Sequence, residues 1–152
     1  MTAFEPRISL VTLGVTDMAR ARTFYEALGW KAGGPSNEHV TFFQGRGIVL
    51  GLFGHDELAK DAGIKSAPPP AFRGMSIAYN CRSEKEVDEA FAHAVTCGAK
   101  ALKQPEKVFW GGYSGYFADP DGHLWEVAFN PFAPLDGDGH MQVEPGGGGE
   151  GA

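Results

Sequence analysis

The pattern of hydrophobic and polar positions divides the chain into two halves that repeat one order of elements. In the first half, residues 8–15 alternate as the side chains of a half-buried strand do. Residues 17–29 follow with apolar side chains at helical spacing, a capping aspartate at the start and Gly29, a frequent helix stop, at the end. Residues 40–44 and 48–53 flank a glycine turn and predict two strands.

The second half repeats this order. Residues 75–81 predict a strand, and Ser83 with Glu86 forms a capping box for a helix that stops at Gly98. Three further strands are predicted at residues 101–103, 114–118 and 124–130. In the two predicted helices, we expect four apolar side chains to be buried: Phe24, Leu28, Phe91 and Val95.

These elements predict a single domain over residues 1–135. It consists of a first module at about residues 7–53, a connector at 54–73 and a second module at about 74–132. The connector ends in three prolines, which favour an extended path. The tail, residues 136–152, is rich in glycine and acidic side chains with little to bury, so we expect it to be disordered.

Composition narrows the class of protein. A chain of 152 residues buries roughly 70% of its unfolded surface, which suffices for one substantial core. The net charge of −6, without a block of Lys and Arg, argues against nucleic acid as a partner and is compatible with a neutral or cationic small molecule. Two cysteines and no long apolar run predict a cytoplasmic protein without membrane contact.

The most informative stretch joins a strong turn signal to an isolated carboxylate. Residues 119–122, Asp-Pro-Asp-Gly, suit a type I turn that closes a hairpin. In the strand that follows, Trp125 and Glu126 face opposite sides, and both sides are otherwise largely apolar. A carboxylate in such surroundings requires a metal ion, a hydrogen-bond partner or a wet cavity.

Two segments resemble the vicinal oxygen chelate superfamily, which includes glyoxalase I, bleomycin-resistance proteins, fosfomycin-resistance enzymes and extradiol dioxygenases. The family's closing hairpin is similar to residues 116–129, YFADPDGHLWEVAF. Its opening strand, Asp-capped helix and Leu-Gly-aromatic exit are similar to residues 10–30. The resemblance implies an α+β fold of two βαβββ modules, whose curved mixed sheets form a cup with the helices on the outer faces.

The resemblance also assigns four metal-ligand positions, which the family's metalloenzymes fill with His or Glu. Only Glu126 keeps a ligand residue. The other three positions fall on Leu10, on Leu52 or Leu50, and on Ser76 or Met75. Zinc, nickel and iron sites use at least three protein side chains, so no cofactor is predicted and a divalent metal is disfavoured. No two of the five histidines have a spacing that would rebuild the site.

Glu126 is the central candidate for function. It can serve as the polar anchor or general base at the floor of the cup, with Tyr79 and Tyr116 as hydrogen-bond partners or acids. An equally weighted alternative is a carboxylate that has lost its role and is satisfied by a neighbouring tyrosine, amide or water. For the two tyrosines, the alternative is a place in the core or at its rim.

A second candidate is the aromatic, glycine-interrupted segment before the turn. We expect it to form a pocket wall, because glycines break strand continuity and let the backbone approach a ligand. The predicted ligand-binding residues are Phe53, Phe109, Trp110, Tyr113, Tyr116 and Glu126. Packing of Trp110 and Tyr113 at a module or subunit interface is an alternative of equal weight.

Two functions follow from these observations. The first is a metal-independent protein, similar to the bleomycin-resistance branch, that binds a small aromatic or cationic molecule in an aromatic cup. The second is a lyase, isomerase or dioxygenase-type enzyme that uses Glu126 as base or as part of an incomplete metal site. The sequence leaves open whether the protein is an enzyme. The resemblance also implies a homodimer, because the family often completes its cups across subunits.

Overall fold

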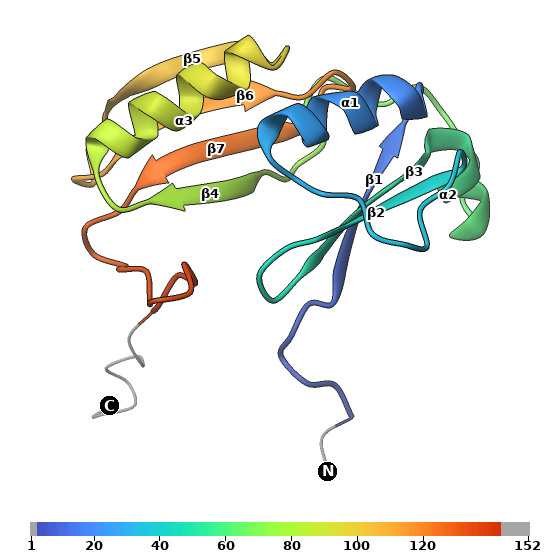
Figure 1. Cartoon of the computed structure of the whole chain (residues 1–152), viewed down its shortest axis with the longest axis horizontal. Helices are drawn as coiled ribbons and strands as arrows, with labels where there is room; N and C mark the ends of the chain where they lie inside the picture. Colours follow the sequence, from blue (N-terminus) through green and yellow to red (C-terminus); the bar gives the residue numbers. More distant parts are fainter. Residues whose placement is uncertain (1–2, 144–152) are drawn as a thin grey trace.

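The computed structural model describes residues 3–143 and has a mixed α+β fold. Its elements, labelled in Figure 1, are β1 (Leu10–Val15), α1 (Met18–Leu28), β2 (Val40–Gln44), β3 (Val49–Gly54), α2 (His55–Asp61), β4 (Ile77–Cys81), α3 (Glu84–Thr96), β5 (Lys100–Lys107), β6 (Tyr113–Ala118) and β7 (Leu124–Phe129). Helices α1 and α3 lie along the same side of the molecule, each over its own sheet (Figure 1). The predicted fold class is confirmed.

The two sheets share one topology. The first has the strand order β1-β3-β2 and the second β4-β7-β6-β5, each with one parallel pair beside antiparallel neighbours. Where the second module has β5, the first has only the isolated bridge between Ala32 and Phe43. The glycines and proline of residues 33–35 explain this difference, because they do not sustain a strand.

Capping sets the helix boundaries where the sequence predicts them. The Asp17 side chain accepts a hydrogen bond from the Arg20 amide, and the Ser83 side chain accepts one from the Glu86 amide. Gly29 closes α1 with a φ of 130°, a conformation that other residues avoid.

The predicted burial holds for two of four helix side chains, Phe24 and Phe91. Leu28 is half-buried and packs against the edge of the core. The prediction for Val95 is wrong, since 41% of its surface is exposed. The apolar stripe of α3 runs through Val87, Phe91 and Ala94 instead, and the helical turn carries Val95 past its edge.

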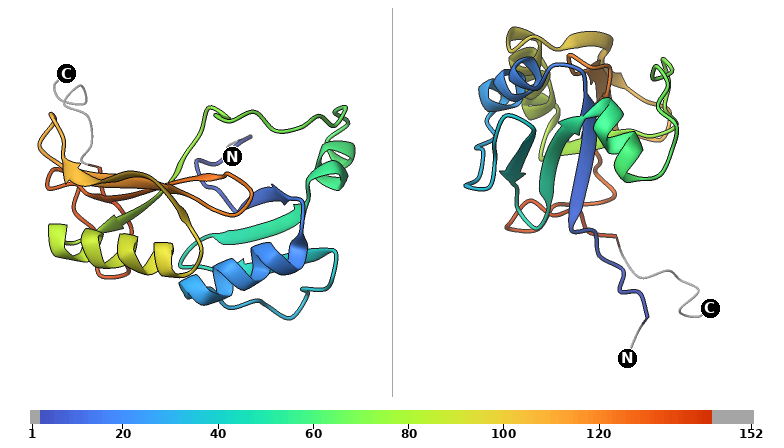
Figure 2. Two further views of the ribbon diagram at one scale, coloured as in Figure 1. Left: turned by 90° about the horizontal axis from the view of Figure 1, so that it is seen from above. Right: turned by 90° about the vertical axis from the view of Figure 1, so that its right-hand side faces the viewer.

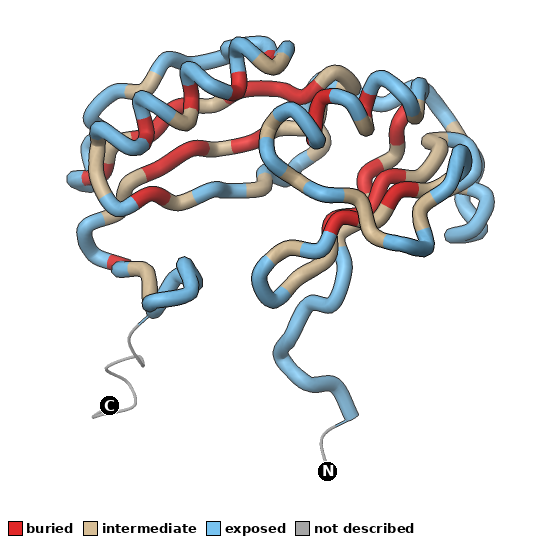
Figure 3. Tube along the Cα trace, viewed as in Figure 1, coloured by how far each residue is buried: buried red, intermediate tan, exposed pale blue. Residues whose placement is uncertain are grey.

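The two modules share one hydrophobic core, and the buried positions of Figure 3 concentrate between the helices and the sheets. The ring of Phe117 on β6 lies 6.4 Å, between centroids, from both Phe24 of α1 and Phe91 of α3. Phe117 is also stacked on Trp125, whose ring lies 6.1 Å from that of Tyr25. A change in the packing of one module should therefore affect the stability of the other.

The turn at residues 119–122 connects the modules through buried polar groups. Its closing hydrogen bond runs from the Gly122 amide to the Asp119 carbonyl, as a type I turn requires. The Asp119 carboxylate accepts a 2.6 Å hydrogen bond from the Tyr25 hydroxyl, which in turn accepts one from Trp125 Nε1 at 3.0 Å. Asp121 Oδ1 accepts hydrogen bonds from the amide and hydroxyl of Thr16.

The connector passes on the side of the sheets opposite α1 and α3, as Figure 2 shows. Arg73 near its end donates hydrogen bonds to His123 Nδ1 and to the Asp121 carbonyl. Because a carbonyl only accepts, the 2.7 Å contact of His123 Nε2 with the Gly14 oxygen places the ring proton on Nε2. None of the helices within residues 3–143 is long and apolar enough to cross a membrane.

The predicted disordered tail has a defined path over its first eight residues, 136–143. Arg82 donates hydrogen bonds to the carbonyls of Leu135 and Asp136, and Arg46 donates one to the Asp138 carbonyl. Backbone hydrogen bonds within the segment close a turn at residues 136–139, Asp-Gly-Asp-Gly, a sequence that favours turns. The rest of the predicted tail, 144–152, lies outside the described residues.

Candidate functional site

Two of the three predicted catalytic residues lie side by side on the face of the second sheet that carries no helix, which we call the open face. Tyr116 on β6 is the direct register partner of Glu126 on β7, and both are half-buried. Burial, followed by the charge of Glu126, raises the pKa of Tyr116 above its ordinary value of 10.0. The pair combines a proton donor with a carboxylate.

The third predicted catalytic residue, Tyr79, lies on the other face. It is the register partner of Val127, whereas Glu126 pairs with Ala78. Since neighbouring residues of a strand point to opposite faces, Tyr79 cannot reach Glu126 through the sheet. The assignment of Tyr79 as a partner of Glu126 is therefore wrong.

The aromatic segment 109–113 does not surround Glu126 either. The Tyr113 hydroxyl donates a 2.7 Å hydrogen bond to Asp88 of α3, on the helix side of the sheet. Phe109 and Trp110 lie in the turn between β5 and β6, where Phe109 is fully exposed and the Trp110 ring covers Gly112. Because Gly112 has no side chain, the Trp110 ring can pack directly against the backbone of its own hairpin.

Phe53 is half-buried near the end of β3, opposite Val40 and Gly14 in the register. It therefore lies on the face of the first sheet away from α1, which we count with the open face although His55 of α2 lies against Gly14 there. Of the predicted ligand-binding residues, only Phe53, Tyr116 and Glu126 share an open face.

A shallow cavity of about 580 Å³, open to solvent and with mostly apolar walls, lies next to Tyr116. Leu102, Leu124 and the connector residues Phe72 and Met75 form its apolar wall. The same four side chains also line a cavity of about 530 Å³ that continues to Thr12 and Gly14 of β1, past Arg73 and His123. Glu126 lines neither cavity and reaches their edge only beside Tyr116.

The residues at the family's metal positions do not fit a metal centre. Leu50 and Leu52, 4% and 0% exposed, point into the core under α1, so the second position is misplaced. The open-face residue between them is Gly51, and Leu10 Cδ1 would lie 3.1 Å from a Cβ atom there. Together with Ser76, these positions provide one carboxylate and one hydroxyl, fewer donors than a transition-metal site uses.

Within residues 3–143, no three His, Cys, Asp or Glu side chains lie close enough to hold a common ion.

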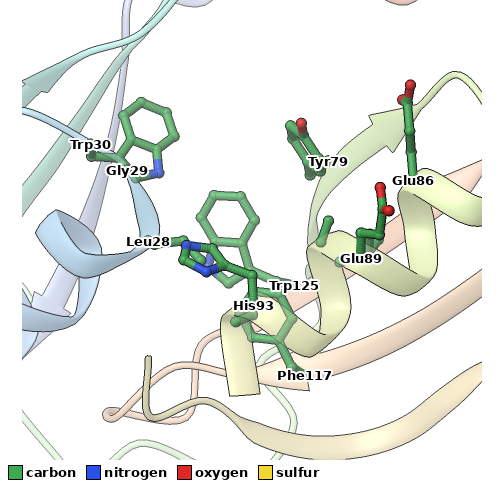
Figure 4. A pocket seen from close by; sticks show the side chains of 12 residues that line it. Leu28, Gly29, Trp30, Tyr79, Glu86, Glu89, His93, Phe117 and Trp125 are labelled. Atoms are coloured by element: carbon green, nitrogen blue, oxygen red, sulfur yellow. The ribbon is translucent and has the colours of Figure 1, made fainter. Parts of the chain in front are cut away.

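A further cavity, of about 540 Å³, lies between the end of α1 and the side of α3, and we call it the interhelical cleft. Phe117 and Trp125 are among the residues that line its sheet side, and Figure 4 shows Trp30, Tyr79, Glu86, Glu89 and His93 around them. None of the predicted site residues except Tyr79 lines this cleft. Its signal in the sequence is the spacing of Glu86, Glu89 and His93, which places the three on one helix face.

Comparison with known proteins gives consistent results. Residues 7–127 match the family model described as the Glyoxalase/Bleomycin resistance protein/Dioxygenase superfamily. The crystal structure of a glyoxalase-related enzyme from Fulvimarina pelagi is 34% identical, covers 93% of this chain and 100% of its own, and superposes with a TM-score of 0.84. A glyoxalase/bleomycin resistance protein/dioxygenase from Nocardioides has a TM-score of 0.73 at 23% identity, with coverage of 95% and 93%, which shows the fold alone.

Among curated sequences, uncharacterized proteins of Mycobacterium tuberculosis and Mycobacterium bovis are 30% identical over 73 residues, 48% of this chain. The chain spans about half the length of these curated relatives, 42% and 47%.

Proposed function

The chain belongs to the Glyoxalase/Bleomycin resistance protein/Dioxygenase superfamily, and from that premise we propose that it binds a small aromatic or cationic molecule on its open face without the family's usual metal centre. The proposal concerns the ligand and the absence of a metal. Membership itself rests on a family match that covers residues 7–127 and on the Fulvimarina pelagi structure.

The observation that carries the proposal is the replacement of metal-ligand positions by apolar surface next to a cavity. Leu10 occupies the space over Gly51, and the Thr12 hydroxyl is the oxygen donor beside it, so the first module offers neither His nor a carboxylate there. In the second module, Glu126 remains beside Tyr116 and the 580 Å³ cavity. Cavities of this size accommodate drug-sized molecules, and a few polar groups at their edge orient the ligand.

Each part of this site supports a different part of the ligand. The leucine, methionine and phenylalanine side chains favour a flat apolar body. Glu126 offers a charge-assisted contact to a cationic group, and protonated Tyr116 can donate a hydrogen bond. Lys103 also lines the cavity, but its ammonium lies 3.2 Å from the Glu106 carboxylate, which offsets its repulsion of a cation.

The test is a thermal-shift screen of aromatic and cationic compounds, followed by calorimetric titration of each hit with variants. Glu126→Gln is expected to keep the fold and weaken a cationic hit by roughly 1–3 kcal/mol, the scale of a charge-assisted contact. Glu26→Gln, an exposed carboxylate of α1 in an ion pair with Arg22, is the matched control and should leave affinity unchanged. Hits whose affinity is the same in Glu126→Gln and in the wild type would contradict the proposal.

The second candidate is an enzyme of the lyase, isomerase or dioxygenase type. The observation that favours it is the retained carboxylate of Glu126 directly opposite the Tyr116 phenol, which sets a candidate base beside a hydrogen-bond donor. In that case, Glu126→Gln would abolish turnover of a hit compound and leave its affinity nearly intact, because an amide takes up no proton. Elemental analysis of untagged protein separates the two, since stoichiometric nickel, zinc, iron or manganese would overturn the metal-free proposal.

We also propose that the protein is a homodimer. Large apolar side chains near the open face are exposed, among them Leu10, Met75, Leu102 and Phe72. Burial of such side chains is the usual driving force of subunit association. Sedimentation at micromolar concentration is expected to give a dimer, and a monomer would count against the proposal.

A further inference from the structure

The interhelical cleft lies on the helix side of the second sheet and is separate from the proposed open-face site. Trp125 and Val127 of β7 line it, whereas Glu126, between them in sequence, points to the other face. Its second wall comes from the first module, through Leu28 and Trp30 at the end of α1. The cleft therefore exists only because the two modules lie side by side (Figure 4).

The aromatic rings of the cleft are held in place from behind. Trp125 donates its Nε1 hydrogen to the Tyr25 hydroxyl, so its polar edge is satisfied inside the core. Its ring is stacked on Phe117 with an interplanar angle of 2°. Trp30 packs on Phe43 and lies over Gly45, which has no side chain to displace it. Rings held in this way need little rearrangement to receive a ligand, which lowers the cost of binding.

The rim of the cleft is acidic. Glu86 Oε1 accepts a hydrogen bond from the Arg82 amide, which fixes the carboxylate at the first turn of α3. Glu89 lies one turn further along, and its contact with Lys85 is long, 3.8 Å, between two exposed side chains. Glu86 forms no ion pair within residues 3–143, and the single pair of Glu89 is long and exposed, so both carboxylates keep most of their negative charge.

The other charged groups around the cleft leave this balance acidic. His93 lies on the same face of α3 and is 3.6 Å from the Cys97 sulfur. Two arginines lie near the cleft: Arg46 donates a hydrogen bond to the Asp138 carbonyl, and Arg82 donates side-chain hydrogen bonds to the carbonyls of Leu135 and Asp136. Burial, then the charges of Cys81 and Glu86, raise the pKa of Tyr79 above 10.0, whereas Arg46 acts in the opposite direction.

We propose that the interhelical cleft is a second binding site, and that its ligand is a small organic cation with a quaternary ammonium group or a cationic aromatic ring. Aromatic faces attract such cations through their ring quadrupoles, and tryptophan does so most strongly. The two carboxylates add attraction from the rim and exclude anions. A volume of about 540 Å³ accommodates a molecule of this class.

Titration with benzyltrimethylammonium chloride tests the site, with the protein's own tryptophans as reporters. Trp110 is replaced by phenylalanine, so that the remaining tryptophans, Trp30 and Trp125, both line the cleft. We expect saturable quenching that weakens at 0.5 M salt, where charges are screened within a few ångströms. Benzyl alcohol, which has the ring without the charge, should give no saturable change.

Variants then assign the binding to the cleft. Trp30→Ala is expected to weaken binding about tenfold, and Glu86→Gln with Glu89→Gln about fivefold. Glu86→Gln keeps the side-chain oxygen that accepts a hydrogen bond from the Arg82 amide, so the helix cap is retained. Glu26→Gln, outside the cleft, is the control for lost charge, and its binding should equal that of the wild type.

Two outcomes would overturn the proposal: no saturable binding up to 20 mM, on the order of the weakest useful ligand affinities, or binding that the cleft variants leave unchanged. If circular dichroism shows that Trp30→Ala is unfolded, calorimetric titration of the variant with Glu86→Gln and Glu89→Gln decides whether the cation binds in the cleft. Glu126→Gln separates this site from the open-face site, because it should not alter binding of the cation in the cleft. Binding lost only in Glu126→Gln would place the cation on the open face and contradict the inference.

Discussion

The two modules have the same topology but carry different kinds of side chain. Four of the six largest fully buried side chains, Tyr25, Thr41, Phe43 and Leu52, belong to the first module, which has three strands and a single bridge. The second module keeps four strands, the acidic face of α3 and the retained Glu126. The difference indicates that the first module contributes mostly packing, whereas the second contributes most of the polar groups of both candidate sites.

This division is incomplete, because the modules share a core and a polar connection. Phe117 of the second module contacts a helix residue from each module. Tyr25 of the first module is the hydrogen-bond partner of Asp119 and Trp125 in the second. The following experiments measure how far the modules depend on each other.

The largest effect is expected from the core phenylalanines. Phe24→Ala and Phe91→Ala should each lower the free energy of unfolding by roughly 3–5 kcal/mol, because both side chains are 3% exposed. Since both contact Phe117, the double variant should lose less than the sum, by 0.5 kcal/mol or more, as residues with a shared partner do. Urea unfolding measures all three values.

The control for this cycle is Phe109→Ala, which removes a fully exposed ring and should change stability by about 0.5 kcal/mol or less. Strict additivity of Phe24→Ala and Phe91→Ala, or two separate unfolding transitions, would mean that the modules are energetically independent.

A smaller effect is expected at the polar connection. Tyr25→Phe removes the hydrogen bonds of Asp119 Oδ2 and Trp125 Nε1, whereas Asp119 Oδ1 keeps two backbone amides. The loss should cost about 1–3 kcal/mol at neutral pH. Tyr113→Phe is the matched control, since its hydroxyl also donates to an aspartate, Asp88, but at the surface. The control should cost under about 1 kcal/mol. Equal costs would contradict the idea that the Tyr25 hydroxyl couples the modules.

The same tyrosine should make the stability of the fold depend on pH in the alkaline range. Burial, followed by the charge of Asp119, raises the pKa of Tyr25 well above 10.0 in the folded state. The unfolded chain therefore releases this proton first, and stability falls as the pH rises above the unfolded pKa of 10.0. Tyr25→Phe should flatten this decline in urea midpoints between pH 9 and about 11, and an unchanged slope would count against a raised pKa.

The smallest effect is expected at the tail. Deletion of residues 136–152 removes the exposed hydrogen bonds of Arg82 and Arg46 and should lower Tm by about 2–4 °C, the equivalent of about 1 kcal/mol. Arg82→Ala should reproduce part of this loss. A change within about a degree would show that the segment makes no net contribution to stability, as expected of a disordered tail.

Local patterns were sufficient for most of the elements, although β5 runs to Lys107, beyond the predicted residues 101–103, and α2 lies within the predicted connector. Asp17, Ser83 and Gly29 define helix ends through hydrogen bonds within a few residues, and the turn at 119–122 closes as its sequence indicates. Strand parity placed Trp125 in the core and Glu126 on the other face. Each of these features depends on residues close together in the chain, so the sequence contains the required information.

Alternation within a strand does not predict which residues of two different strands point to the same face of a sheet. Tyr79 and Glu126 are distant in sequence, and only the pairing of Tyr79 with Val127 shows that they face apart. Leu50 and Leu52 were assigned to the open face, but the register of β3 with β1 turns them into the core. A shift of one residue reverses the face of every side chain in a strand.

The sequence by itself determined the two repeated modules, the helix caps, the closing turn and the single retained carboxylate, because these follow from spacing and local hydrogen bonding. Only the tertiary structure decided which residues meet across the modules: Tyr25 with Asp119, and Trp30 with Trp125 around the interhelical cleft. These meetings depend on how two sheets and two helices pack, and packing is set by contacts between residues about 100 positions apart.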